Sequence, residues 1–269
     1  MALEHLADLS DERLADYHHL REPSRRMGIE RDRGIFTVEG RLSVEALLES
    51  PYTCRSVLVI AEQADRLSGL VPHDVPVYAL PARAIEAVTG VHFHRGVLAV
   101  AERPALPSVR DVVRGARRVL VLEAVNDHEN IGSLFRNAAA FGVDAVVLDP
   151  TSADPLYRRA TRVSLGHVLR VPFARVEDGS WPGALAQLAD EGITTLALTP
   201  AADADAIGAV VAERPDRVAL MVGAEGPGLS DDAMAAAARR VRIPLAPGVD
   251  SVNVATAAAI ALSALHGWA

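Results

Sequence analysis

Short apolar runs alternate with segments of helical spacing along the first hundred residues. Three runs are apolar enough throughout to predict buried strands: 56–61, 75–80 and 96–102. Two segments have the spacing of helices: 42–50, which stops at Pro51, and 82–90, which ends in a glycine. This alternation predicts a small α/β domain over residues 29–103, and the polar residues 1–28 before it are interpreted as an N-terminal extension with a short helix at 11–20.

After a charged, proline-containing linker at 104–118, the pattern restarts and continues to the C-terminus. Largely apolar segments predict strands at 119–125, 144–150, 194–200, 217–223 and 241–245. Helices are expected between and after them, at 131–142, 155–164, 185–192, 231–240 and 251–267. Strands that are apolar throughout and separated by helices indicate a parallel sheet covered on both faces, so a second α/β domain is expected over 119–269.

Composition favours a packed globular protein, since half the residues are hydrophobic and 23% are charged. No apolar run reaches the roughly 18 residues needed to span a bilayer, so no membrane association is expected. The acidic N-terminus lacks the features of a signal or transit peptide, and a cytoplasmic location is expected. The single cysteine, Cys54, is interpreted as a small buried hydrophobe rather than a nucleophile.

The net charge of −8 argues weakly against a nucleic-acid partner, although the distribution of charge matters more than its sum. The chain has no lysine, so every phosphate contact must come from a guanidinium or a backbone amide. Arginines gather in two clusters, which are either solvated faces or RNA-binding surfaces: Arg21, Arg25, Arg26, Arg31 and Arg33, and Arg158, Arg159, Arg162, Arg170 and Arg175.

The first candidate loop is ENIGSLFRNAAAFG (129–142). Asn130 lies at the expected start of a helix, where asparagine is a favoured cap, and Gly132 allows a ligand or backbone to approach closely. Arg136 lies about one and a half turns further on. The alternative is a capped amphipathic helix with an arginine on its surface.

Two more candidate loops follow strands in the second half. MVGAEGPGLSDD (221–232) lacks the dinucleotide-binding spacing and the lysine of a P-loop, and its Glu225 between glycines is either functional or simply solvated. RIPLAPGVDSVNVATAAAIALSA (242–264) ends in an alanine-rich helix opened by Ser251 and Asn253, which are either caps or functional groups. Ligands bind at such strand ends in open α/β sheets.

Taken together, the three loops resemble the three signature motifs of the SpoU/TrmH family of RNA 2′-O-ribose methyltransferases. The residues that carry the resemblance are Asn130, Gly132, Arg136 and AAAFG in the first motif, GAEGPGL in the second, and IPLAPGVDSVNVATAAAI in the third. The match covers about 150 residues, with Ala224 and Val252 as departures from the commonest family pattern. Residues 34–50 and 96–102 also resemble the family's small ribosomal-protein-like substrate-binding domain.

The resemblance implies a trefoil-knotted methyltransferase domain that binds S-adenosylmethionine, needs no metal and forms a homodimer with its active site at the subunit interface. It implies cofactor contacts from Thr199, Gly223, Ile243, Leu245 and Val252. It assigns Arg136 to removal of the hydroxyl proton, with Asn130, Glu225, Ser251 and Asn253 as positioning residues. Because a free arginine almost never loses its proton, we interpret Arg136 as binding the RNA phosphate and polarising the hydroxyl.

The RNA substrate, ribosomal or transfer, would be bound by the first domain and the two arginine clusters. Two other functions remain open: an RNA-binding protein on the same fold that does not catalyse, and an unrelated α/β enzyme with a nucleotide cofactor. His92 and His94 could ligate a metal, but no further ligand lies at suitable spacing, and a loop or strand position is favoured. The alanine-rich final helix has small residues around most of its circumference, which favours burial against a second copy over burial within one subunit.

Overall fold

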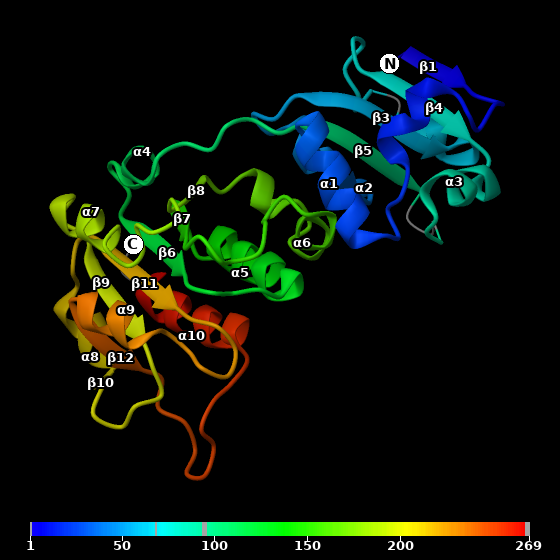
Figure 1. The fold of residues 1–269 in the computed structure, drawn as a ribbon. Helices are drawn as coiled ribbons and strands as arrows, with labels where there is room; N and C mark the ends of the chain where they lie inside the picture. Colours follow the sequence, from blue (N-terminus) through cyan, green and yellow to red (C-terminus); the bar gives the residue numbers. More distant parts are fainter. Residues whose placement is uncertain (1, 68, 93–95, 267–269) are drawn as a thin grey trace. The chain divides into compact units, whose positions relative to one another are not determined.

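The computed structural model describes residues 2–67, 69–92 and 96–266. The chain forms two compact units, and its path crosses between them more than once (Figure 1). Unit 1 comprises Met1–Ala105 and Leu156–Arg170, and unit 2 comprises Leu106–Pro155 and Val171–Ala269. No described helix is long and apolar enough to cross a bilayer.

Unit 1 is built on a mixed five-stranded sheet. Its strands are β1 (Ala2–His5), β2 (Ile35–Glu39), β3 (Cys54–Ile60), β4 (Pro76–Leu80) and β5 (Val97–Glu102). Their order is β1-β4-β3-β5-β2, with β1 and β3 parallel to β4 and with β5 antiparallel to β2 and β3. Its helices are α1 (Pro23–Arg33), α2 (Arg41–Leu48), α3 (Ala82–Thr89) and α6 (Arg158–Val163).

Residues 2–28 are an integral part of unit 1, in contrast to the separate extension expected from the polar composition of 1–28. β1 pairs with β4 at the edge of the sheet. In place of the helix expected at 11–20, a 3-10 helix spans Glu12–Tyr17, and Leu14 and Tyr17 are buried in the core. Few apolar residues are enough here because their partners lie on strands far along the chain, which sequence periodicity does not report.

Arg26 belongs to the first arginine cluster, yet it is 1% exposed. Its Nε donates to Glu30 Oε1 at 2.9 Å, and its guanidinium also donates to Thr37 Oγ1 and to the Asp16 carbonyl oxygen. Glu30 accepts a second hydrogen bond from Thr37 Oγ1 at 2.7 Å. The buried guanidinium of Arg26 therefore connects α1 to β2 through hydrogen bonds and is not available to RNA.

Arg26→Ala is expected to lower the free energy of unfolding by about 3–5 kcal/mol, because it leaves the Glu30 carboxylate buried without its cation. Chemical denaturation checks this. The control is Arg31→Ala on the same helix, where the side chain is 83% exposed and a change within about 0.5 kcal/mol is expected. Equal stability of the two variants would show that the buried pair contributes little.

Residues 156–170 pack in unit 1, although the sequence pattern assigned them to the domain 119–269. α6 lies against β2, where Arg158 forms an ion pair with Glu39. Ser43 Oγ donates to the Thr161 carbonyl oxygen at 3.3 Å. A Cβ on Gly166 would lie 2.5 Å from that of Ala46, so the backbones approach closely. Deleting residues 1–103 would therefore strip this segment of its partners rather than separate two domains cleanly.

Unit 2 contains a seven-stranded sheet in which every pair is parallel, as the uniformly apolar strands predicted. The strands are β6 (Arg118–Leu122), β7 (Ala145–Leu148), β8 (Phe173–Arg175), β9 (Thr194–Leu198), β10 (Asp205–Ala206), β11 (Val218–Val222) and β12 (Arg239–Arg242). Their order is β10-β12-β9-β11-β6-β7-β8. The helices are α4 (Val109–Val113), α5 (His128–Ala140), α7 (Leu185–Asp190), α8 (Ile207–Glu213), α9 (Asp231–Ala236) and α10 (Val254–His266).

The α9–β12 region differs from the helix expected over 231–240. α9 ends at Ala236, and β12 begins at Arg239 rather than at 241. The Ala238 amide donates to Thr195 Oγ1 at 2.8 Å, and Arg239 forms an ion pair with Asp205. These long-range contacts favour a strand where local alanine content favours a helix.

Candidate active site

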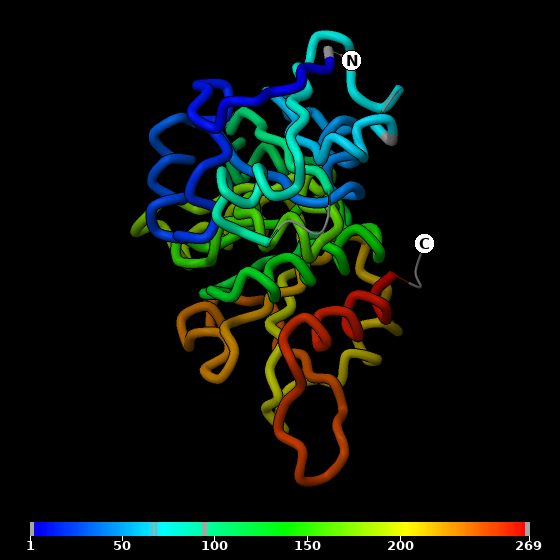
Figure 2. The backbone as a smooth tube through the Cα atoms, turned by 90° about the vertical axis from the view of Figure 1, so that its right-hand side faces the viewer, coloured from blue at the N-terminus to red at the C-terminus, as the bar shows by residue number. Residues whose placement is uncertain are grey.

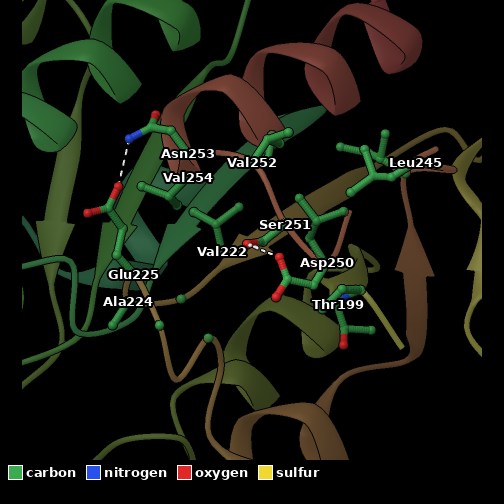
Figure 3. A pocket seen from close by; sticks show the side chains of 17 residues that line it. Thr199, Val222, Ala224, Glu225, Leu245, Asp250, Ser251, Val252, Asn253 and Val254 are labelled. Carbon is green, nitrogen blue, oxygen red and sulfur yellow. Dashed lines mark hydrogen bonds between the residues drawn. The ribbon is translucent and has the colours of Figure 1, made fainter. Parts of the chain in front are cut away.

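A cavity of about 350 Å³ lies in unit 2 at the carboxyl ends of three neighbouring parallel strands (Figure 3). Three segments line it, and they follow β9, β11 and β12. This is the edge of a parallel sheet at which ligands bind. The five residues predicted to contact a cofactor all line the cavity: Thr199, Gly223, Ile243, Leu245 and Val252.

Most of the cavity wall is aliphatic, from side chains such as Leu198, Val222 and Val254. Few charged groups reach it, and they are Glu225 and Asp250. The segment between β12 and α10 runs as an open loop and contributes Ser251 to the wall (Figures 2 and 3). Ligand sites typically combine an apolar wall of this kind with a few placed polar groups, in volumes of roughly 300–1,000 Å³.

Gly223 is required by the path of the loop that follows β11. A Cβ at this position would lie 2.1 Å from the carbonyl carbon of Gly228 and 2.3 Å from the Leu229 amide nitrogen. The Gly228 amide donates to the Ala224 carbonyl oxygen at 3.0 Å, which closes the turn. The loop therefore folds back on its own backbone and presents Glu225 at its tip.

Asn253 joins the three sequence motifs through its side-chain amide. Its Nδ2 donates to Glu225 Oε1 at 2.7 Å and to Asn130 Oδ1 at 2.9 Å. Its Oδ1 accepts from the amides of Ala255 and Thr256, so it caps α10. Figure 3 shows the Asn253–Glu225 bond at one end of the cavity. All the hydrogen-bonding capacity of this amide is used, which holds the three motifs in one arrangement.

Asn130 does not cap α5, in contrast to the expectation from sequence. Asp127 is the cap, and its Oδ1 accepts from the amides of Glu129 and Asn130. Asn130 lies in the first turn, where its side chain is free to bond Asn253. Ser251, considered as a possible cap of α10, instead donates to Asp250 Oδ1 at 3.2 Å.

Arg136 is exposed on α5 and is not among the residues that line the cavity. No ion pair or hydrogen bond connects its side chain to another described residue. Its neighbour Asn137 donates from Nδ2 to the Ala255 carbonyl oxygen at 2.8 Å and anchors α5 to α10. Within a single copy of the protein, the other predicted catalytic residues therefore lie together, and Arg136 lies apart from them.

Glu123 supports the site but was not singled out by sequence motifs. It follows β6, is 6% exposed, and accepts hydrogen bonds from Trp181 Nε1 at 2.6 Å and from the Ser230 amide at 2.8 Å. Ser230 Oγ also donates to it and caps α9. The carboxylate therefore fixes the far end of the loop that carries Glu225. The sequence signal that could have identified Glu123 is a charged residue directly after an apolar strand.

Many arginines of the two clusters have acidic or carbonyl partners within the protein, and RNA binding by the clusters stays a prediction. In the first, Arg25, Arg31 and Arg33 have acidic partners, and Arg26 is buried. The acidic or carbonyl partners in the second are Glu39 for Arg158 and Arg162, Glu49 for Arg170, and four backbone carbonyls for Arg175.

The remaining candidates do not converge on the cavity. Burial raises the pKa of the Cys54 thiol to about 12, so it stays protonated at neutral pH. His92 pairs with Glu86, and His94 lies outside the described residues.

Known proteins resemble this chain in sequence and in fold. The model of the SpoU rRNA Methylase family matches residues 117–263. An uncharacterized tRNA/rRNA methyltransferase of Mycobacterium tuberculosis is 47% identical over 261 residues, covering 95% of this chain and 89% of the relative. A 23S rRNA (guanosine(2553)-2′-O)-methyltransferase of Bacillus subtilis is 31% identical, covering 86% of this chain and 88% of the relative.

Solved structures show the same two-part architecture. One from Porphyromonas gingivalis, assigned to the TrmH family of RNA methyltransferases, has a TM-score of 0.80 at 27% identity and covers 96% of this chain and 98% of its own. An AdoMet-bound rRNA methyltransferase from Sinorhizobium meliloti has a TM-score of 0.79 at 22% identity, covers 98% of both chains and supports the fold. The resemblance carried by the three motifs is confirmed: the chain belongs to the SpoU rRNA methylase family.

Proposed function

We propose that the protein transfers a methyl group from S-adenosylmethionine to a ribose 2′-hydroxyl of structured ribosomal or transfer RNA in the cytoplasm. The observation that carries the proposal is the Asn130–Asn253–Glu225 chain of hydrogen bonds at the end of an apolar cavity. It joins the three motifs of the family beside the loops expected to hold the cofactor.

The cavity suits S-adenosylmethionine in size and chemistry. Aliphatic residues such as Leu198, Ile243 and Leu245 offer a surface for the adenine ring, and the loop at Gly223 exposes backbone to a ligand. Asp250 and Glu225 offer carboxylates to the cationic methionine end. The bound cofactor supplies an electrophilic methyl group on its sulfonium sulfur.

The chain's own residues then position the acceptor. Holding the ribose oxygen in line with the methyl carbon, about 3 Å away, supplies much of the catalysis. An arginine rarely gives up its proton, so Arg136 binds the RNA phosphate and polarises the hydroxyl rather than acting as a base. As the oxygen–carbon bond forms, the carbon–sulfur bond breaks to leave a thioether, and the hydroxyl proton passes to water. Asn253, whose side-chain hydrogen bonds are all made within the chain, holds Asn130 and Glu225 in position, and these two residues with Ser251 position the ribose and the cofactor.

We also propose that the protein is a homodimer whose active site is completed across the subunit interface. Arg136 does not line the cavity of its own chain, so we propose that each cavity receives Arg136 from the second copy. α10 packs against α5 but leaves an uncharged stripe exposed at helical spacing: Thr256, Ile260 and Ser263. Ile260 is 42% exposed, which favours contact with a second helix.

Ile260→Glu is expected to convert the dimer to a monomer, because it places a charge in an apolar contact. Light scattering at low micromolar concentration measures the change. Leu42→Glu is the matched control, since Leu42 is 58% exposed on α2 in unit 1 and should leave the dimer intact. A wild-type chain that is monomeric and still methylates RNA would refute both the dimer and the shared site.

The function itself is tested with labelled S-adenosylmethionine and total RNA. Label is expected at one nucleotide whose 3′ phosphodiester resists alkali, since alkaline cleavage needs a free 2′-hydroxyl. Ribosomal RNA is the first substrate to test, because a 31% identical relative is named for it. Cofactor binding without any transfer would favour the RNA-binding alternative, and binding of NAD or ATP instead would overturn the family-based proposal.

A further inference from the structure

A second cavity in unit 2, of about 180 Å³, lies at the amino ends of the parallel strands, whereas the candidate active site lies at their carboxyl ends. It is lined by Arg117, Arg118, Arg214, Pro215, Asp216 and Val218. Arg118 and Val218 are the first residues of β6 and β11 and are paired in register. Both strands end four residues later, and β11 leads into a loop of the first cavity, so the two cavities are separated by a strand length of about 13 Å or more.

Three guanidinium groups and one carboxylate give this small cavity a formal charge of +2. No ion pair or hydrogen bond links the side chains of Arg117, Arg118 and Arg214 to other described residues. Neighbouring Arg217 contrasts with them, because it donates to the Ala116 and Val113 carbonyl oxygens. Asp144 also lies beside them, since its Oδ2 accepts from the backbone amides of Arg117 and Arg118. Guanidinium groups therefore outnumber carboxylates by three to two here, in a chain of net charge −8.

Arg214 is held in a backbone conformation that an arginine adopts at a cost. It ends α8 in the left-handed region, with φ of 50° and ψ of 57°. Among helices whose C-terminal cap is described, two others end in this conformation, α1 and α3, and both use glycine there: Gly34 and Gly90. A non-glycine residue at such a position costs about 1 kcal/mol or more, and strain of this kind is concentrated at functional sites. An arginine at a position where glycine would be unstrained indicates that its side chain has a role.

We propose that Arg117, Arg118 and Arg214 form an anion site that takes a phosphate of the RNA substrate's backbone. The planar guanidinium matches a phosphate through paired hydrogen bonds. The cavity is about half the volume of the cofactor cavity, and its lining contains no aromatic ring on which a base could stack. It therefore makes a sequence-independent contact that sets the position of the RNA, while base recognition occurs elsewhere.

This inference rests on the proposed function, because it takes RNA as the substrate. The decisive variant is Arg214→Gly, since glycine relieves the backbone strain and also removes one of the three guanidinium groups that would bind the phosphate. We expect its melting temperature to equal or exceed that of the wild type and its affinity for S-adenosylmethionine to stay within twofold. RNA affinity should fall about tenfold, and the slope of log K against log salt should decrease by about 0.7–0.9, the value for one lost phosphate contact.

Arg118→Gln provides a second variant that leaves the α8 cap unchanged and should show the same loss. Arg110→Gln is the matched control, because Arg110 is an exposed arginine of the same unit beside Asp190 and should change neither affinity nor slope. A separate arm measures binding of inorganic phosphate by NMR, which the wild type should show and Arg214→Gly should lose.

The outcomes separate this site from the proposed function. Wild-type methylation with unchanged RNA affinity and salt slope in both variants overturns the RNA-phosphate site and leaves the enzyme assignment intact. Phosphate binding that the variants lose, without any effect on RNA, overturns RNA as its source. Absence of methyl transfer by the wild type contradicts the proposed function, whatever the phosphate arm shows.

Discussion

Replacing Arg136 by alanine is expected to lower the rate of methyl transfer by at least about 100-fold, the loss typical of removing one group that stabilises a transition state. Affinity for S-adenosylmethionine should stay within twofold, because Arg136 does not line the cofactor cavity. Single-turnover transfer from labelled cofactor and calorimetric binding measure the two quantities. Arg114→Ala is the control, since Arg114 is also an exposed arginine of unit 2. Full activity of Arg136→Ala would remove Arg136 from the catalytic assignment.

Mixing two inactive variants shows which chain supplies Arg136. Arg136→Ala and Asn253→Ala each break a site, and in a shared site the mixed dimer contains one cavity with Asn253 opposite a chain with Arg136. About one quarter of the wild-type activity should then return, because half the dimers are mixed and half of their sites are intact. If Arg136 serves its own chain, both sites of the mixed dimer stay broken and no activity returns.

Gly223→Ala is expected to weaken binding of S-adenosylmethionine about 100-fold, which corresponds to about 3 kcal/mol. The added Cβ would lie 2.1 Å from the Gly228 carbonyl carbon, and backbone cannot move aside as a flexible side chain can. The loop carrying Glu225 must therefore shift, and overpacking of this kind costs about 1–3 kcal/mol or more. Calorimetry with the purified variant measures the loss.

The matched control is Gly208→Ala in α8. A Cβ there meets nothing within 4 Å, and helical alanine is favoured over glycine by roughly 1 kcal/mol, so this variant should bind normally and unfold at an equal or higher temperature. If Gly223→Ala binds the cofactor as tightly as Gly208→Ala does, the loop after β11 does not form the cofactor site.

The amino-acid sequence by itself determined the family, the α/β class and the loops that form the cavity. Runs such as 119–122 and 218–222 are apolar throughout because both faces of a parallel sheet are buried, and motifs at strand ends are brought together by the sheet. The five predicted cofactor residues came from the resemblance of the motifs to the family, and all five line the cavity. The trefoil knot comes only from the resemblance and stays a prediction.

Only the tertiary structure decided which polar groups meet. Asn253 bonds Glu225, 28 residues away, and Asn130, 123 residues away, and hydrophobic periodicity carries no information on such pairs. The same limit explains why Arg26 proved to be buried and why residues 156–170 joined unit 1. Periodicity reports which face of an element is buried, whereas the partner of each charge depends on how distant segments pack.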